Sequence, residues 1–276
     1  MSPTFDIPAW LEACRPDDAL YAQAYEACPA QLRALLKTSI AFAFHRSGMK
    51  DGETDIRVDC PRAGFVRREH FRPAAWTLAV TGKNFASPAR FLAAALPAVL
   101  AGVPHVLTVS PAPFAPALST ALELAGLEDS FLLDAEGLAS LYEDLRAASP
   151  DGRILVFPGP EGFDEGMKDL LHKAAADGTP LYRDRAAPRI LSLYKNTDTP
   201  AAGEVAKRLL WLHPDATLLD MPSPGMDAVF TPQPCAETFD APLTAGPGME
   251  ACWPGPSPEF FRTGALCAQL VQEIRS

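Results

Sequence analysis

The segment from Trp76 to Gly126 constrains the fold most, because it alternates short apolar runs with longer stretches of helical period. The runs 76–81 and 105–109 have the length of strands, whereas 87–101 and 115–125 have the length of helices and end at Gly102 and Gly126. Two buried strands joined by a helix must run parallel. The segment therefore predicts the core of an α/β fold. Its turn at 82–84 is placed at the carboxyl edge of the sheet, where ligands bind in such folds.

The same alternation continues beyond Gly126. Strands are predicted at 130–134, 153–157 and 179–182, and helices at 135–148 and 163–176. A glycine-rich turn, Pro158 to Gly162, follows the strand at 153–157. The pattern from 76 to 182 predicts a doubly wound α/β domain, with a parallel sheet and flanking helices.

The chain on either side of this core is less regular, and we predict three parts. Residues 1–72 form an N-terminal helical cap and linker, with helices over 8–47 that end at Gly48 and strand-like pieces at 55–58 and 64–67. Residues 73–186 form a dinucleotide-binding-like α/β domain. Residues 187–276 form a C-terminal α/β segment with a proline-rich tail. Within it we expect a strand at 189–194, a helix from about 196 to 212, brief strands at 217–220 and 228–230, and a closing helix from Ser257 to Ile274.

Charge and hydropathy narrow the classes of partner. The net charge of −10 would on average repel a phosphate backbone, which argues against nucleic acid. No apolar run reaches the length of a membrane span, and the N-terminus lacks the pattern of a secretion signal. We expect a cytoplasmic protein that binds a small molecule and associates with neither nucleic acid nor membrane.

Several segments, taken in order, resemble histidinol dehydrogenase, an enzyme of the wider aldehyde-dehydrogenase-like fold group. The resemblance covers about 76 to 274 in patches. The matching segments are Gly82 to Pro104, Ser110-Pro-Ala-Pro, 121–129, 134–141, Gly159-Pro-Glu-Gly162, 187–194, 198–210, 241–246 and 257–262.

The resemblance implies an aldehyde dehydrogenase-like, Rossmann-type parallel sheet, NAD as cofactor and a homodimer. The residues that would position the cofactor are Lys83, Asn84, Phe85, Ser87, Ser110, Pro111, Gly159, Pro160, Glu161 and Gly162. From the residues alone, Lys83 and Asn84 could contact a phosphate or ribose at the start of a helix, or could form an ordinary solvated turn. The glycines of 159–162 could admit a ligand or serve only a tight turn.

This chain differs from the family at the residues that carry the family's catalysis. The family uses a zinc ion and a glutamate–histidine pair, and its zinc-binding helix carries a Gln-Ala-Glu-His run. The corresponding place here reads Leu210-Trp-Leu-His-Pro-Asp215, so only His213 could be retained. The five histidines form no metal-binding spacing, and His213 suits the end of a helix. We expect no zinc site.

Aldehyde dehydrogenase chemistry would instead need a thiolate near a glutamate base. Cys235 with Glu237, or Cys252 with Glu250, could supply it, although neither pair lies in a glycine-flanked context. No catalytic residue is assigned. Two hypotheses remain: a divergent histidinol dehydrogenase-like, NAD-binding oxidoreductase without zinc, or a non-catalytic binding or assembly module that retains the fold.

Overall fold

A five-stranded parallel sheet lies at the centre of the molecule. The computed structural model describes residues 6–48, 52–60, 62, 64–196, 200–233 and 239–270. The strands follow the order β5-β4-β3-β6-β7, with β3 at the centre. Their bounds are β3 (Trp76–Thr81), β4 (Val106–Ser110), β5 (Ser130–Leu132), β6 (Gly152–Phe157) and β7 (Leu181–Arg183). Strands β3, β4 and β6 are buried along their whole length, which explains their near-continuous apolar sequence.

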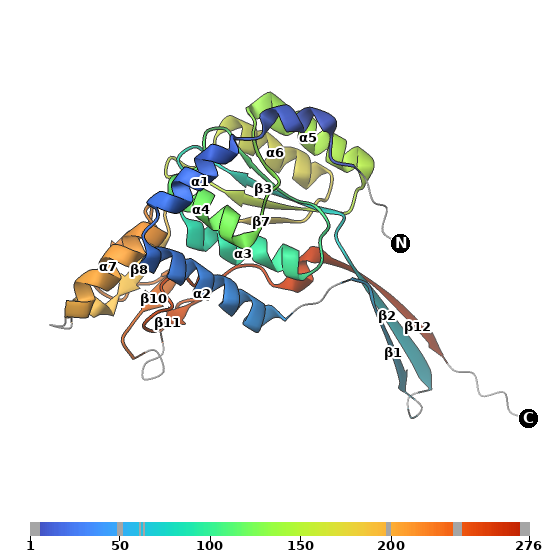
Figure 1. Cartoon of the computed structure of the whole chain (residues 1–276). Helices are drawn as coiled ribbons and strands as arrows, with labels where there is room; N and C mark the ends of the chain where they lie inside the picture. The colour runs from blue at the N-terminus through green and yellow to red at the C-terminus, as the bar shows by residue number, and fades with distance from the viewer. Residues whose placement is uncertain are drawn as a thin grey trace, which may run out of the picture.

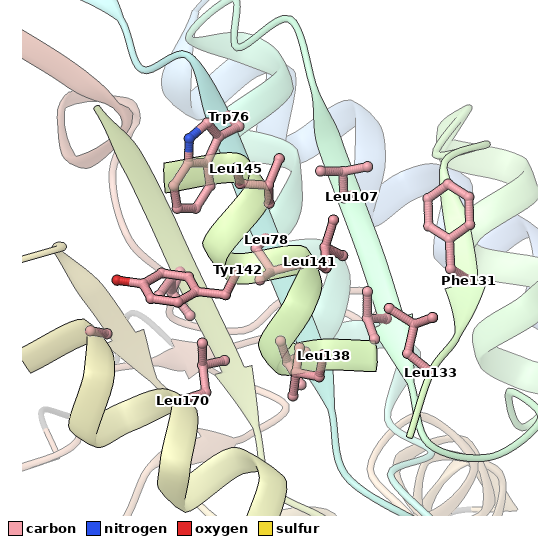
Figure 2. Packing of buried hydrophobic residues seen from close by; sticks show 14 of the residues in the cluster. Trp76, Leu78, Leu107, Phe131, Leu133, Leu138, Leu141, Tyr142, Leu145 and Leu170 are labelled. Atoms are coloured by element: carbon pink, nitrogen blue, oxygen red, sulfur yellow. The ribbon is translucent and has the colours of Figure 1, made fainter. Parts of the chain in front are cut away.

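Helices cover both faces of this sheet. On one face, α5 (Ala135–Ala148) and α6 (Glu165–Ala176) pack on alternate residues of β3, including Leu78 and Val80. Figure 2 shows Leu138, Leu141 and Leu145 of α5 among these side chains. On the other face, α3 (Pro88–Leu100) and α4 (Pro116–Ala125) pack on Ala79 and the residues around it. The doubly wound parallel sheet with flanking helices predicted from 76–182 is confirmed.

The N-terminal segment lies along both sides of the central sheet. Its 3-10 helix η1 (Ala9–Cys14) packs on the α5 side, where Leu11 joins the side chains of α5 and the Trp10 ring nitrogen donates to Asp144 at 3.0 Å. The helices α1 (Asp18–Ala27) and α2 (Ala30–Ser47) lie against α3 and α4. Leu32, Leu35 and Leu36 of α2 join Leu92 and Leu96 of α3 in one cluster of buried side chains. Gly48 ends α2 with a positive φ of 62°, as its position predicted.

A second, four-stranded parallel sheet follows, in the order β11-β10-β8-β9. Its elements are β8 (Arg189–Ser192), η2 (Leu193–Asn196), α7 (Pro200–Leu212), β9 (Thr217–Leu219), β10 (Ala228–Phe230) and β11 (Thr244–Ala245). Val205 and Leu209 of α7 pack on Ile190 and Phe230 of this sheet, with Trp253 beside them. The helix predicted from about 196 is therefore present from Pro200, while residues 197–199 lie outside the described part of the chain.

The third sheet is an arm of three antiparallel strands, in the order β1-β2-β12. It is built from β1 (Thr54–Cys60), β2 (Phe65–Pro73) and β12 (Arg262–Leu270), and it extends away from the two parallel sheets (Figure 1). A 3-10 helix η3 (Pro258–Phe261) leads into β12.

The closing helix predicted from Ser257 to Ile274 is wrong, because residues 262–270 form a strand and residues 271–276 lie outside the described part. Leu266 and Leu270 are four residues apart, which fits the same face of either a helix or a strand. Pairing along the whole of β2 decides for the strand. Within the described residues, no helix combines the length and the apolar character needed to cross a membrane.

Candidate functional site

The sheet order creates a topological switch point between β3 and β6. Connections from β3 lead to β4 and β5 on one side, whereas those from β6 lead to β7 on the other. In open α/β folds, the crevice for a ligand lies beyond the carboxyl ends of the strands at such a point. The two turns singled out from the sequence, 82–84 and 158–162, follow these two strands.

The two turns contact each other through backbone atoms. The amide of Gly82 donates a hydrogen bond to the carbonyl of Phe157, at 2.7 Å. A Cβ at Gly159 would lie 2.1 Å from the carbonyl oxygen of Lys83, and a Cβ at Gly82 would lie 2.6 Å from the amide nitrogen of Gly159. Glycine is therefore required at both positions by close backbone packing. Gly162 closes the second turn, with its amide 2.9 Å from the carbonyl of Gly159 and a φ of 94°.

Lys83 and Asn84 lie at the surface of this edge. Both residues are exposed, and Asn84 adopts a left-handed backbone conformation with a φ of 65°. Asparagine tolerates this conformation better than most residues, because its short polar side chain can bond locally. The turn thus presents the Lys83 ammonium beside the switch point.

A cavity of about 290 Å³ opens over the carboxyl ends of β3, β4 and β5. Its apolar lining comes from Val80, Val109, Pro111, Leu133, Ala135, Leu138, Gly166 and Met167. Its polar lining is Thr81, Lys83, Asp134, Asp164 and Glu165. One lysine and three carboxylates therefore meet at a mainly aliphatic hollow between the starts of α5 and α6.

Sequence reasoning missed the carboxylates of this cavity. Asp134 accepts a hydrogen bond from the Gly137 amide at 2.8 Å and so caps α5, and Asp164 caps α6 through the Met167 amide, also at 2.8 Å. For Asp134 the signal was available, because an aspartate at the end of a predicted strand and directly before a predicted helix is a typical N-cap. Asp164 falls inside the helix predicted over 163–176, whereas in the structure α6 begins one residue after it. A cap at that position necessarily lies at the carboxyl edge of the sheet.

Of the ten predicted cofactor-binding residues, only Lys83 and Pro111 are among the residues that line the cavity. Pro111 lines it, but the Ser110 hydroxyl donates to the carbonyl of Ala112 at 2.6 Å and is buried. Pro160 and Glu161 are exposed in the second turn and are not among the lining residues.

Phe85 and Ser87 point into the interior instead of the cavity. The Phe85 ring packs against Phe157 with centroids 5.3 Å apart, and the Arg90 guanidinium lies over the Phe85 ring at 5.1 Å. Ser87 caps α3 and donates from its hydroxyl to the carbonyl of Leu212 at 2.7 Å. The Ser87 hydrogen bond ties the start of α3 to the end of α7.

Arg90 is the centre of a buried charged network between the two parallel sheets. Its guanidinium lies 3.1 Å from a carboxylate oxygen of Asp184, pairs with Asp215, and donates to the carbonyl of Arg185 at 2.7 Å. Burial raises the pKa of Asp184 to about 6, and Arg90 opposes this shift. Burial also raises the pKa of Asp215 above its ordinary value. The pairing holds a charge that could not be buried alone.

His213 is fully buried at the end of α7. Its ring packs against Trp253 in a tilted arrangement with centroids 4.8 Å apart, and its Nε2 lies 3.1 Å from the carbonyl of Glu250. Burial lowers the pKa of His213 to about 3, so the imidazole is neutral. Among the described residues, no three His, Cys, Asp or Glu side chains are grouped in a way that could hold a metal ion. These contacts make His213 a packed side chain at the junction of the two sheets.

Of the two cysteine–glutamate pairs, the structure describes Cys252 with Glu250. Burial raises the pKa of the Cys252 thiol to about 11, and Glu250 is buried with Arg208 2.9 Å away. Cys252 is therefore a protonated thiol at neutral pH and is not poised as a nucleophile. Cys235 and Glu237 lie outside the described residues.

No family model matches the chain, and no curated protein matches it. Among solved structures, the histidinol dehydrogenase from Elizabethkingia anophelis aligns with 96% of this chain and 78% of its own, at 11% identity and a TM-score of 0.54. The chain shares the fold of a histidinol dehydrogenase. At this identity the likeness concerns the fold alone, and it agrees with the resemblance of the ordered segments.

Aldehyde dehydrogenases are also similar, over less of their length. The succinate-semialdehyde dehydrogenase from Burkholderia pseudomallei aligns with 80% of this chain and 50% of its own, at 14% identity and a TM-score of 0.38. The lactaldehyde dehydrogenase from Escherichia coli aligns with 77% and 45%, at 15% identity and a TM-score of 0.35. The fold assignment rests on the alignment with the histidinol dehydrogenase.

Proposed function

We propose that this protein binds a nicotinamide dinucleotide at the carboxyl edge of its five-stranded sheet, as a divergent histidinol dehydrogenase-like oxidoreductase that works without zinc. The observation that carries the proposal is the cavity over β3, β4 and β5, with Lys83 at the end of the central strand. A concave, mainly aliphatic hollow with a few polar groups, beside a switch point, is the usual setting of a dinucleotide.

Each side chain has a role suited to part of such a ligand. The Lys83 ammonium would pair with the pyrophosphate, and Asn84 would support it from the same turn. The Asp134 and Asp164 carboxylates would accept hydrogen bonds from ribose hydroxyls, and the aliphatic floor would take a planar ring. Phe85 and Ser87 would not touch the ligand. Their buried contacts would hold the 82–84 turn in place.

The charges of the cavity favour NAD over NADP. Three carboxylates (Asp134, Asp164 and Glu165) line it beside a single lysine. The additional 2′-phosphate of NADP would meet this acidic lining and would be repelled.

When bound, the dinucleotide supplies hydride transfer, whereas the protein supplies binding and orientation. Metal assistance is not part of the proposal, because His213 is enclosed between Trp253, Phe230 and the Glu250 carbonyl. A cytoplasmic location also remains part of this proposal.

Calorimetric titration of the full chain with NAD, NADH and NADP tests the proposal. We expect binding of NAD or NADH in the micromolar to millimolar range, and at least tenfold weaker binding of NADP. Absence of heat for all three at millimolar ligand would contradict it, and preferred binding of NADP would contradict the electrostatic argument.

A non-catalytic binding module is the second candidate. It is favoured by the protonated, buried Cys252 and by Glu250, which is already paired with Arg208. Turnover of an amino alcohol or aldehyde with NAD that is lost in Lys83→Ala would refute this candidate. Dinucleotide binding without turnover of either class would support it.

A further inference from the structure

A groove lies between α1 and the start of α4, two helices that are neighbours in the fold (Figure 1). Its volume is about 300 Å³. We call it the α1–α4 groove. Its apolar lining comes from α1 on one side and from the loop after β4 and the start of α4 on the other: Leu20, Ala24, Ala27, Pro113, Phe114 and Pro116. These residues differ from those that line the cavity over β3, β4 and β5, so the groove is a separate hollow.

The walls of the α1–α4 groove are held in place. Three of its lining residues are prolines, whose backbone angle φ is fixed. Tyr21 also lines the groove, and its hydroxyl lies 2.6 Å from the Ser130 hydroxyl oxygen, which ties α1 to β5. Leu20 is nevertheless 49% exposed, so a large apolar side chain is half in solvent beside a preformed hollow. An occupant that covers Leu20 buries apolar surface at little cost in ordering the walls.

Exposed carboxylates surround this apolar hollow. Asp17 and Asp18 lie at the start of α1, and Glu26 lies in its last turn. Glu123 lies in α4, one turn after the lining residue Ser119 and on the same face of the helix. We call these four carboxylates the acidic rim. The sequences of α1 and α4 contain neither lysine nor arginine.

The arginines that flank α1 in the sequence are held by other groups. Arg15 lies 2.8 Å from a carboxylate oxygen of Glu12 and 2.9 Å from one of Asp129. Arg33 donates to the carbonyl of Tyr25 at 2.8 Å, and its guanidinium lies over the ring of the same residue at 4.8 Å. Positive charge supplied by an occupant would therefore be favourable at the acidic rim.

We propose that the α1–α4 groove binds an extended segment of another protein, in which apolar side chains are flanked on both sides by lysine or arginine. The spacing of the acidic rim favours a peptide over a small organic cation. Asp18 and Glu26 are eight residues apart on one helix, which corresponds to about 12 Å. An extended chain spans this distance in about four residues, whereas a small cation reaches one end only. The proposal does not depend on dinucleotide binding.

Each part of such a segment has a counterpart in the groove. Its apolar side chains would fill the hollow between Leu20 and Phe114, and its basic side chains would pair with Asp18 and Glu26. Gln23 is exposed in the lining and offers its side-chain amide to the peptide backbone. A short segment buries less area than a standard interface, and its exposed ion pairs are screened by salt. We therefore expect micromolar affinity that weakens as salt concentration rises.

Selection from a displayed library of random twelve-residue peptides, with the full chain as bait, tests the proposal. We expect the enriched peptides to share apolar residues with lysine or arginine on both sides. A synthetic peptide of that consensus is then titrated by fluorescence anisotropy. Leu20→Lys places a positive charge in the groove and should weaken binding at least tenfold. Ala22→Lys is the matched control, because it adds the same charge to an exposed position on the opposite face of α1, and it should leave binding unchanged.

The acidic rim is tested separately with the same peptide. Glu26→Lys should weaken binding at least fivefold, since it replaces an attraction with a repulsion. Asp169→Lys makes the same change at an exposed position of α6, on the other face of the central sheet, and should have no effect. Raising sodium chloride from about 50 to about 500 mM should also weaken binding. Circular dichroism of each variant establishes that the fold is retained.

Three results of these experiments would overturn the proposal. They are the absence of any enriched sequence, enrichment of neutral or acidic apolar peptides, and a consensus peptide that binds Leu20→Lys as tightly as the natural chain. A second copy of the chain is the other possible occupant of the groove. Self-association that Leu20→Lys removes, measured by sedimentation equilibrium, would identify that occupant and would contradict the peptide.

Discussion

Two neighbouring pieces of chain at the end of β3 differ sharply in what surrounds them. Residues 82–84 form an exposed turn that brings Lys83 to the cavity. Residues 85–90, directly after it, are largely buried, and Phe85, Ser87 and Arg90 contact β6, α7 and the loops beyond β7 and α7. Residues 82–84 are available to a ligand, whereas the buried contacts of residues 85–90 fix the position of that turn. Spacing alone would group them as one site.

Among changes in the buried segment 85–90 and its contacts, Arg90→Met should lower the free energy of unfolding most. It leaves the carboxylates of Asp184 and Asp215 buried without their cation, a change that typically costs about 3–5 kcal/mol. The free energy of unfolding from urea denaturation measures this. Arg57→Met removes an exposed arginine of the arm and should change stability by less than about 0.5 kcal/mol. Equal effects of the two variants would contradict a special role for Arg90.

Gly159→Ala should be the next most harmful change, because it forces the two turns apart. The new Cβ would lie 2.1 Å from the Lys83 carbonyl oxygen, and overpacking of this kind costs about 1–3 kcal/mol. Denaturation in urea checks the loss. Gly203→Ala in α7 is the control, since nothing lies within 4 Å of its Cβ and alanine favours the helix. A Gly159→Ala variant as stable as the natural protein would show that the turns do not pack as described.

Ser87→Ala should cost about 1–2 kcal/mol, through loss of the α3 cap and of the hydrogen bond to the Leu212 carbonyl. Thermal unfolding of the variant gives the change. Ser257→Ala is a fair comparison, because Ser257 precedes η3 without making a side-chain cap. If Ser87→Ala altered dinucleotide affinity at unchanged stability, Ser87 would belong to the binding site and the comparison above would fail.

The buried network also predicts a dependence of stability on pH. The pKa of Asp184 is about 6 in the folded protein against an ordinary value of 3.8, so the folded state keeps a proton that the unfolded chain releases between these values. The free energy of unfolding should therefore fall as pH rises from about 4 to about 6. Asp184→Asn should show a shallower fall, although Asp215 keeps part of it. Urea denaturation across this range measures both slopes, and identical slopes would rule out Asp184 as a cause.

The sequence predicted the central sheet because its strands are buried on both faces and read as continuous apolar runs. It failed at β12, where Leu266 and Leu270 fit both helical and strand periods and the partner strand lies about 200 residues earlier. Register with β2 is a long-range property that periodicity cannot reveal.

The sequence also indicated part of the candidate site, whose role in binding stays a prediction. Glycine-containing turns and Lys83 are local signals, and the structure places both turns at the switch point. Phe85 is buried against Phe157 of β6, and Ser87 donates to Leu212 at the end of α7, more than 120 residues later. These long-range neighbours could not be read from spacing. The Asp134 cap was readable from the sequence, whereas Asp164 was placed inside the helix predicted over 163–176. The cavity that both carboxylates line depends on the packing of α5 beside α6.

The most direct test of dinucleotide binding at this edge is a calorimetric titration of NAD into three proteins: the natural chain, Lys83→Ala and Lys37→Ala. Lys37 is exposed on α2, away from the cavity, and controls for the loss of one positive charge. We predict that NAD binds the natural chain and Lys37→Ala equally and binds Lys83→Ala at least tenfold more weakly, with all three equally stable. Equal binding by all three, or binding by none at millimolar NAD, would contradict the account.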